Sequence, residues 1–281
     1  MTVRLETEKH PVVGVLGLGR FGSALRNALE AIGVAVKARD RDDQDRESLA
    51  DWMSGCKVLC LAIRDDQLPD LVKAMAEEKV AGKTVLIHGG TAPLKLLSPL
   101  QARGATVGKF HPLQSFTQTG RAAGIPKGTP FAIEGEILDL VKPWVSAWSG
   151  ELHVLGSEDW LVYHLAAVTA ANFLPLLIRS GASILEPLSG NRQSALAWLR
   201  PLVQKSVDLA LDGDVALPFS GPAIRRDQKT MELHRHYLRT HFPDLLALYR
   251  LASERIMDWP GSRNGKANDK QRADGPAQGP G

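Results

Sequence analysis

Three glycines near the start of this 281-residue chain constrain its fold more than any other feature. They lie in Gly17-Leu18-Gly19-Arg20-Phe21-Gly22, directly after the apolar run Val12–Leu16. The apolar residues of Phe21–Ile32 then recur with the i, i+3, i+4, i+7 spacing of a helix face, and Gly33 suits the left-handed position that follows a helix. A strand, a glycine-rich turn and a helix in this order predict the start of a βαβ unit.

The spacing of these glycines is typical of a turn that receives a pyrophosphate. Gly17 permits the tight turn, Gly19 lets the backbone approach the ligand, and Gly22 lets the helix pack closely. The first helical turn then offers free N–H groups and the positive end of its dipole to the phosphates. We therefore expect a dinucleotide to contact these glycines together with Arg20 and Phe21. The alternative is a glycine-rich turn that binds no ligand.

The end of the second expected strand, Val34–Ala38, indicates which dinucleotide this would be. Asp40 lies 23 residues after Gly17, where an acidic residue binds the ribose hydroxyl of NAD. Arg39 and Arg41 flank it and suit the 2′-phosphate of NADP, because guanidinium groups bind phosphate through paired N–H donors. We predict NADP, with NAD as the alternative. A solvated run of alternating charge explains the same residues without a ligand.

Strands and helices alternate over the first half of the chain, which predicts a mostly parallel sheet covered on both faces. The expected strands are 12–16, 34–38, 57–63, 84–88, 106–109, 130–133 and 152–155. Beyond residue 158 only long helical patterns follow, at 160–188, 193–211, 225–242 and 244–256. We expect an α/β Rossmann domain over 1–158, an all-α helical domain over 159–260 and a disordered tail over 261–281.

The charge of the chain argues against a nucleic-acid partner. The formal net charge is +3, and four basic against two acidic residues after position 260 contribute +2 of it. The remainder therefore carries about +1 and offers no basic face. The two cysteines, Cys56 and Cys60, have no metal-site spacing, so we expect reduced thiols in the cytoplasm and no bound metal.

The sequence offers little support for a membrane or secretory protein. The first ten residues contain no apolar run of the kind found in a signal peptide. Leu161–Ile178 is uncharged for 18 residues, the lower limit for a spanning helix, but it contains several polar residues and a proline. We expect this segment to be a helix buried at a domain or subunit interface.

Several later motifs occur together in one known group. They are His111-Pro112-Leu113-Gln114-Ser115-Phe116, Phe131-Ala132-Ile133-Glu134-Gly135, Tyr163-His164-Leu165-Ala166-Ala167, Ala171-Asn172-Phe173, and Ser220-Gly221-Pro222 followed by Arg225, Asp227, Thr230 and His234. As a set they resemble bacterial Rossmann-like proteins whose helical half is the domain of unknown function 2520, over roughly residues 10–252. That group is similar to the superfamily of 6-phosphogluconate dehydrogenase, pyrroline-5-carboxylate reductase and ketopantoate reductase.

The resemblance implies a nicotinamide-dependent reductase whose active site lies between the two domains. It also implies a homodimer built through the helical domain, and some relatives look like ketopantoate reductases. This chain departs from the pattern in one place. Relatives often carry an acidic residue followed by lysine just before the long helix, whereas this chain has Asp159-Trp160.

Reduction of a carbonyl leaves negative charge on oxygen, so the site needs a hydrogen-bond donor and a proton source. In the wider superfamily, a lysine and an asparagine on the first long helix of the second domain often provide this donor and this proton. Here His164 and Asn172 are the polar candidates, and a spacing of eight residues puts both near one face of an α-helix. His164 can donate a proton near neutral pH, although a lone histidine on an apolar helix is often structural.

Further candidates lie in a loop that is expected after the fifth strand. His111 is the third catalytic candidate, because ligands of α/β sheets bind beyond the ends of the strands. Gln114 and Ser115 would contact the substrate. The alternative is a loop made rigid by Pro112, with its apolar residues as packing anchors.

The remaining candidates also follow expected strands or begin a helix. Ile63, Arg64, His88 and Gly89 follow strands at the same expected edge and should line the cofactor. Arg225, next to Arg226 and Asp227, would bind an acidic substrate, or else would form a surface ion pair at the start of a helix.

The sequence therefore favours an NADP-dependent oxidoreductase that transfers a hydride to the C=O of a small, ketopantoate-like oxo acid. Two alternatives stay open. One is reduction of an imine in place of a carbonyl, and the other is a non-catalytic dinucleotide sensor. The expected partners are a small-molecule substrate and a second copy of the chain, with no nucleic acid and no membrane.

Overall fold

A computed structural model of the chain describes residues 11–40, 47–117, 124–214 and 218–260. It divides the chain into two compact units, Met1–Ala171 and Asn172–Gly281. The division lies later than the predicted domain boundary at residue 158, so the first helix after that boundary is grouped with the first unit. The predicted domain limits therefore stay a prediction. Arg41 and the tail after residue 260 lie outside the described residues.

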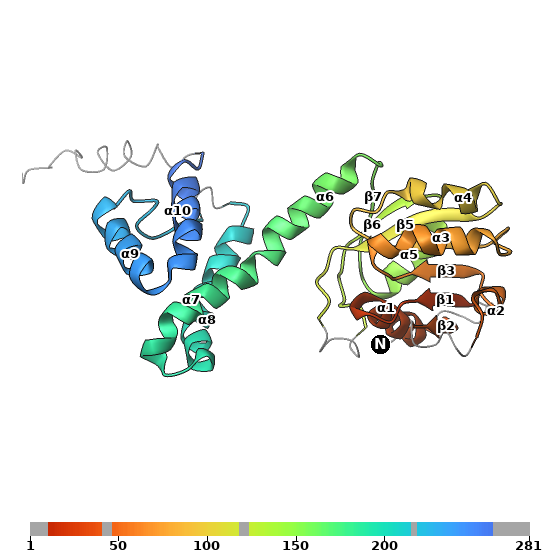
Figure 1. The fold of residues 1–281 in the computed structure, drawn as a ribbon, viewed down its shortest axis with the longest axis horizontal. Coiled ribbons are helices and arrows are strands. Elements are labelled where there is room, and N and C mark those ends of the chain that lie inside the picture. The colour runs from red at the N-terminus through yellow and green to blue at the C-terminus, as the bar shows by residue number, and fades with distance from the viewer. Residues whose placement is uncertain (1–10, 41–46, 118–123, 215–217, 261–281) are drawn as a thin grey trace, which may run out of the picture. The chain divides into compact units, whose positions relative to one another are not determined.

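The first unit is built on a seven-stranded sheet, which confirms the predicted α/β class (Figure 1). Its strands are β1 (Val13–Leu16), β2 (Val36–Arg39), β3 (Val58–Leu61), β4 (Thr84–Ile87), β5 (Thr106–Pro112), β6 (Phe131–Gly135) and β7 (Leu152–Val154). They lie in the order β2-β1-β3-β4-β5-β6-β7. The pairs from β2 to β5 are parallel, β6 runs antiparallel to β5, and β7 is parallel to β6.

Helices cover both faces of this sheet, as the near-continuous apolar strands predict. The elements between strands are α1 (Arg20–Ala31), α2 (Leu49–Ser54), η2 (Asp65–Gln67), α3 (Leu68–Ala76), η3 (Leu94–Leu97), α4 (Ser98–Gln101) and α5 (Leu138–Ala147). One core joins α1 and α5 to one face of the sheet, around Leu25, Phe110 and Trp144. A second core joins α2, α3 and α4 to the other face, around Trp52 and Met75.

His111 lies in a strand and not in the loop that the sequence predicted. The predicted fifth strand ends at residue 109, but β5 continues to Pro112 because it pairs with β6 there: His111 is opposite Ala132 and Pro112 opposite Phe131. Antiparallel pairing with a strand so distant in sequence leaves no local signal in the segment after residue 109.

A long helical stretch follows β7. It comprises α6 (Asp159–Ala167), a π-helical turn at Val168–Asn172, and α7 (Leu174–Ser189). The predicted single helix over 160–188 is therefore interrupted. His164 lies in α6, whereas Asn172 is the last residue of the π-helical turn, so the α-helical spacing used to place them on one face does not apply.

The second unit consists of helices packed in pairs, in agreement with the predicted all-α class. After α7 come α8 (Arg192–Leu211), α9 (Gln228–His241) and α10 (Pro243–Met257), and α7 packs on α8 as α9 does on α10. The predicted helix start at residue 225 is three residues early. Asp227 caps α9, because its carboxylate accepts hydrogen bonds from the backbone N–H and the hydroxyl of Thr230.

Candidate functional site

The glycine-rich turn has the geometry that its spacing predicts. Gly17 adopts a left-handed φ of +92°, and a side chain there would lie 2.6 Å from the Ala62 carbonyl oxygen. A Cβ on Gly22 would lie only 1.8 Å from the Gly17 carbonyl oxygen. In contrast, a Cβ on Gly19 would meet no atom within 4 Å. Two glycines therefore hold the turn against α1 and β3, while the third leaves open space in front of the helix N-terminus.

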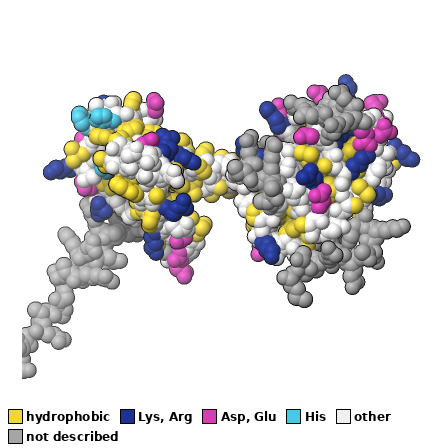
Figure 2. Space-filling model, turned by 90° about the horizontal axis from the view of Figure 1, so that it is seen from below, with side chains coloured by type: hydrophobic (Ala, Val, Ile, Leu, Met, Phe, Trp, Pro, Cys, Tyr) yellow, Lys and Arg dark blue, Asp and Glu magenta, His cyan; other side chains and the backbone are white. Residues whose placement is uncertain are grey.

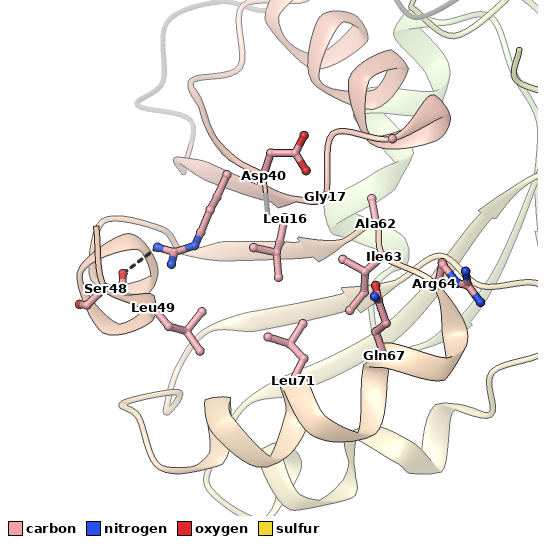
Figure 3. Close-up of a pocket in the computed structure, with 12 residues that line it drawn as sticks. Leu16, Gly17, Asp40, Ser48, Leu49, Ala62, Ile63, Arg64, Gln67 and Leu71 are labelled. Atoms are coloured by element: carbon pink, nitrogen blue, oxygen red, sulfur yellow. Dashed lines mark hydrogen bonds between the residues drawn. The ribbon is translucent and has the colours of Figure 1, made fainter. Parts of the chain in front are cut away.

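This open space is part of a cavity of about 840 Å³ (Figure 3). Gly17 and Gly19 form one side of it, Arg39 and Asp40 lie at the end of β2, and Ile63 and Arg64 follow β3. No side chain of the described residues caps α1, so its first N–H groups can bind an anion from this cavity. The turn and the ends of β2 and β3 thus form one concave surface at the carboxyl edge of the sheet.

Arg39 has a structural role that the sequence did not indicate. Its side chain is buried, and Nη1 donates to the carbonyl oxygens of Glu47 and Ser48 at 2.5 and 2.9 Å. Ser48 is the N-cap of α2, so the guanidinium fixes the start of this helix beside the cavity. Asp40 accepts a 3.4 Å hydrogen bond from the backbone N–H of Leu18 and so supports the glycine-rich turn.

Two other predicted cofactor residues are exposed. Arg20 begins α1 at the edge of the turn. Arg64 lines the cavity while forming a two-pronged ion pair with Asp66, with both N–O distances at 2.9 Å. Neither arginine is buried, so each is free of the packing constraints that hold Arg39.

A second cavity of about 160 Å³ adjoins the first, since Ala62 and Ile63 line both. Phe21 and Phe116 contribute aromatic walls, and Gln114 contributes a polar side chain. His88 also lines it and is buried at 7% exposure. Within the described part of the chain, its Nε2 has no hydrogen-bond partner. Burial lowers the pKa of His88 to about 4, so the ring is neutral near pH 7.

These features fit a dinucleotide. The glycine turn leaves room for phosphates, and the smaller cavity beside it is lined by aromatic rings and by a histidine whose buried Nε2 is unpaired among the described residues. The predicted contacts Gly17, Gly19 and Phe21 all lie along it, as do Ile63 and His88. Such a buried unpaired polar atom is uncommon in folded proteins and indicates a ligand that supplies its partner.

The loop Gly89–Ala92, which we call the β4 loop, is held by the half-buried carboxylate of Asp65 and the buried ammonium of Lys109. Asp65 accepts hydrogen bonds from the Ala92 N–H at 3.1 Å and the Thr91 hydroxyl at 3.2 Å, and a Cβ on Gly89 would lie 1.8 Å from its carboxylate. Lys109 donates from Nζ to the carbonyl oxygens of Gly90 at 3.2 Å and Ala92 at 2.9 Å. Asp65 therefore holds a backbone N–H of the loop, and Lys109 holds two of its carbonyl oxygens.

Lys109 is fully buried, and its surroundings explain how a charge is tolerated there. Its ammonium lies 3.8 Å from the centre of the Trp160 ring, a cation–π contact, and no carboxylate lies within ion-pair distance among the described residues. Burial lowers the pKa of Lys109 to about 8, while Glu134 and Asp65 act in the opposite direction. Trp160, the residue that departs from the family pattern, therefore packs on a cation from β5.

Two of the three predicted catalytic residues come together beside the β4 loop. The centroids of the His111 and His164 rings are 6.5 Å apart. Tyr163 is the neighbour of His164 in α6, and its hydroxyl lies 3.4 Å from His111 Nδ1. A Cβ on Gly90 would lie 2.1 Å from His164 Cδ2, so the histidine ring rests directly on this glycine. His164 is therefore positioned by the same loop that Lys109 and Asp65 hold.

The protonation states of this cluster differ from what the sequence suggested. Burial lowers the pKa of His111 to about 4, with smaller contributions from His88, Lys109 and His164. Burial raises the pKa of Tyr163 to about 12, so its hydroxyl keeps its proton at all ordinary pH values. His111 is thus neutral near pH 7 and is a poor acid there, whereas Tyr163 is a permanent donor.

Three other predicted site residues are exposed in the described structure. Ser115 is exposed, and its N–H donates to the side chain of Gln114. Asn172 and Arg225 are exposed and belong to the second unit. Arg226 donates to the Met257 carbonyl oxygen, which together with the capping role of Asp227 gives this segment a structural function.

Sequence reasoning missed Asp65, Lys109 and Tyr163. Only Lys109 had a usable signal, because a lysine inside the apolar run from Val107 to Phe110 breaks the pattern of a buried strand. Tyr163 stood next to a predicted residue, but nothing local linked it to His111, which is 52 residues away.

Comparison with known families supports this organisation. Residues 6–112 match the model of a Rossmann-like domain, and residues 129–256 match the domain of unknown function 2520 (DUF2520). No curated protein sequence matches the chain.

Solved structures share the fold over nearly the whole chain. A candidate NADP oxidoreductase from Bacteroides fragilis is 20% identical with a TM-score of 0.74, covering 89% of this chain and 98% of its own. A Thermotoga maritima protein is 19% identical with a TM-score of 0.62, covering 90% and 99%. A reductive aminase from Aspergillus terreus, in complex with NADPH and ethyl levulinate, is 18% identical with a TM-score of 0.63, covering 90% and 96%.

At these identities the likeness shows the fold alone. The two family matches follow one another in the order that the glycine-rich turn and the later motifs predicted. The chain therefore consists of a Rossmann-like domain followed by the domain of unknown function 2520.

Proposed function

We propose that this protein is an NADP-dependent oxidoreductase that reduces a small oxo acid. The observation that carries the proposal is a pair of neighbouring cavities that share Ala62 and Ile63 as lining: one of about 840 Å³ at the glycine-rich turn, and a smaller one beside His88 and His111. A dinucleotide suits this arrangement, because its phosphates bind at the turn and its reactive ring lies beyond it. Solved proteins of the same fold include one in complex with NADPH.

The choice of NADP rests on the arginines at the end of β2. Arg39 lines the cavity, although two backbone carbonyls already occupy its Nη1. Arg41 follows two residues later, outside the described residues. We assign Arg41 the direct contact with the 2′-phosphate and Arg39 the support of the wall beside it. This assignment replaces the expectation that both arginines bind the phosphate directly with one in which only Arg41 does.

Bound NADPH supplies the hydride, and the chain must supply a proton and bind the developing negative charge. We assign the proton transfer to His164, because His111 is neutral near pH 7 and Tyr163 holds its proton firmly. Tyr163 and His111 would then donate hydrogen bonds to the substrate oxygen or orient it. Asn172 and Arg225, from the helical unit, stay candidates for binding the substrate carboxylate and carbonyl.

Reduction of an imine is the second candidate activity. Proteins of the same fold include reductive aminases and an imine reductase. An imine nitrogen is more basic than a carbonyl oxygen and accepts a proton more readily, so a donor that serves the carbonyl reaction would also be sufficient for the imine. The polar cluster of His111, Tyr163 and His164 suits both reactions.

We also propose that the protein acts as a homodimer through its helical region. The helical stretch Asp159–Ser189 is long and apolar enough, by length and composition alone, to cross a membrane. In the single chain, its most apolar part is not buried. Figure 2 shows apolar side chains at the surface of the helical unit. A second copy of the chain would bury these side chains, and an interface of this kind explains why the expected burial is absent from one chain.

The test is a reductase assay with a panel of small oxo acids, with and without added amines, in which NADPH oxidation is monitored. We expect turnover with NADPH, a strong preference for NADPH over NADH, and loss of that preference in Arg41→Ala. His164→Asn should lower kcat while leaving NADPH binding intact. Binding of NADPH without turnover on any oxo acid or imine would indicate a dinucleotide sensor, and an unchanged kcat in His164→Asn would exclude our assignment of the proton donor.

A further inference from the structure

His88 holds a hydrogen-bond acceptor in a place where water cannot easily reach it. The residue follows β4, and its ring lies between Phe21, with centroids 4.9 Å apart, and Phe110, with centroids 6.0 Å apart. Its side chain lines the cavity of about 160 Å³ and is only 7% exposed.

The hydrogen bond on one side of the ring fixes the role of the other side. His88 Nδ1 lies 2.6 Å from the Phe110 carbonyl oxygen, which can only accept. Nδ1 must therefore carry the proton, and Nε2 of the neutral ring is left as an acceptor. The lowered pKa, about 4, keeps the ring in this state over the range in which enzymes work. Nε2 has no partner among the described residues.

The walls of the cavity indicate what kind of group would bring the missing donor. Phe21 and Phe116 present aromatic rings, with centroids 5.3 Å apart, and Gln114 adds a polar side chain. A flat heteroaromatic ring packs well against such walls, whereas a sugar carries hydroxyls that these apolar surfaces leave unsatisfied. A ring with an N–H donor at its edge would pack against the aromatic walls and also donate a hydrogen bond to Nε2.

We propose that His88 Nε2 accepts a hydrogen bond from the carboxamide N–H of the nicotinamide ring and so selects dinucleotides that carry this amide. The inference rests on the proposed function and goes further, because it assigns one atom of the protein to one group of the cofactor. A competing donor is a hydroxyl of the adjacent ribose, and the experiment must separate the two.

The experiment compares three reduced dinucleotides by isothermal titration calorimetry on the full chain. NADPH and its thionicotinamide analogue both carry the N–H donors, whereas the 3-acetylpyridine analogue has a methyl group in their place. All three share the same ribose hydroxyls. We expect wild type to bind the acetylpyridine analogue about fivefold more weakly than the other two, the loss that corresponds to one net hydrogen bond.

Two substitutions form a matched pair. His88→Asn keeps a donor near the Phe110 carbonyl but has no group at the position of Nε2, so the fivefold discrimination should disappear. His88→Gln extends further and can present its amide oxygen near that position, so part of the discrimination should return. Thermal unfolding of each variant shows whether it is folded, and His88→Phe, which retains the ring shape, replaces His88→Asn if that variant does not fold.

The outcomes separate the inference from the proposed function. If wild type does not bind NADPH, the proposed function fails. If wild type binds all three dinucleotides equally, or if His88→Asn discriminates as wild type does, the inference fails while the proposed function stands. Weaker binding of all three dinucleotides to His88→Asn with unchanged discrimination would assign the contact to the ribose and would also overturn the proposal.

Discussion

The two units of this chain differ in how well each buries its own apolar side chains. In the first unit, large side chains such as Trp52, Phe110 and Phe131 are fully buried against the sheet. In the second unit, α7 and α8 bury only the alanines Ala182 and Ala195, while leucines and a tryptophan of the same helices stay exposed. The exposed large residues of α7 and α8 are Leu174, Leu176, Leu177, Leu188, Trp198, Leu202 and Leu211.

The first unit has two closed cores and holds polar residues such as Lys109 through buried hydrogen bonds. The helical unit pairs its helices through small side chains and leaves its larger ones exposed. Large exposed apolar surfaces are typical of interaction sites, which supports the proposed dimer. The predictions below test the contrast between the two units, from the largest expected effect to the smallest.

The largest effect should come from charges placed on the exposed face of α8. Trp198 and Leu202 are one helical turn apart and are 61% and 64% exposed. In the double variant Trp198→Glu/Leu202→Glu, formation of the proposed dimer would bury two unpaired carboxylates. We expect dimerisation at least about a hundredfold weaker, measured by sedimentation velocity.

The matched control is Leu138→Glu in α5, an exposed leucine of the first unit at 42% exposure. It should leave the dimer unchanged. A double variant that sediments like wild type, at concentrations where wild type is dimeric, would place the interface elsewhere and would weaken the contrast between the units.

The same glycine-to-alanine change should lower activity in the first unit and leave it unchanged in the second. In Gly90→Ala, the new methyl group would lie 2.1 Å from His164 Cδ2 and push the ring away. Because a misplacement of this size near the reacting atoms is expensive, kcat should fall about a hundredfold, with a much smaller change in NADPH binding.

Gly213→Ala in the second unit is the control, because a Cβ there meets no atom within 4 Å and φ is not positive. It should have wild-type kinetics. If Gly90→Ala is as active as Gly213→Ala in steady-state assays, His164 is not the proton donor in the arrangement that we describe.

Lys109 offers a third comparison, between a buried and an exposed lysine. In Lys109→Met, the carbonyl oxygens of Gly90 and Ala92 lose their buried donor, and the free energy of unfolding should fall by about 2 kcal/mol. Lys205→Met, at an exposed position of α8, should change it by less than about 0.5 kcal/mol. Urea denaturation of both variants gives the measurement, and equal values would contradict the role of Lys109 in holding the β4 loop.

The pH dependence of Lys109 has a definite sign. Its folded pKa, about 8, lies below the ordinary value of 10.5, so between these pH values the unfolded chain binds more protons than the folded one. Stability that depends on Lys109 should therefore increase as pH rises from 8 toward 10.5. Lys109→Met should lack this increase, and a wild type with the same slope as the variant would contradict the lowered pKa.

The sequence was sufficient for those features that depend on local pattern. The glycine turn, the alternation of strands and helices, and the change to an all-helical second half follow from spacing and composition. Contacts between distant segments left no such pattern. The pairing of β5 with β6, which places His111 in a strand, and the hydrogen bonds from Lys109 to the β4 loop join residues that nothing nearby in sequence links.

The candidate site was accordingly only half predictable. The residues that follow strands, such as Ile63 and His88, lie along the expected cavities because parallel strands end at one edge. The roles of Arg39 and Asp227 were not predictable, since each depends on backbone groups that only the folded chain brings near. The π-helical turn before α7 also escaped prediction, because its apolar residues fit an α-helix equally well.

The smallest effect should come from acidification, through the buried histidines of the first unit. His111 has a folded pKa of about 4, below the ordinary 6.5, so the unfolded chain binds the proton first as pH falls. Stability is thus fully present above pH 6.5 and is lost as pH falls toward 4. We expect the Tm of wild type to fall by about 3 °C more than that of His111→Gln over this range, since glutamine has no proton to gain.

The control is His236→Gln, which replaces an exposed histidine of α9 and should follow wild type. If His111→Gln and wild type lose stability in parallel, the histidine is not held neutral by burial, and the acid role that we gave to His164 would have to be reconsidered for His111 as well.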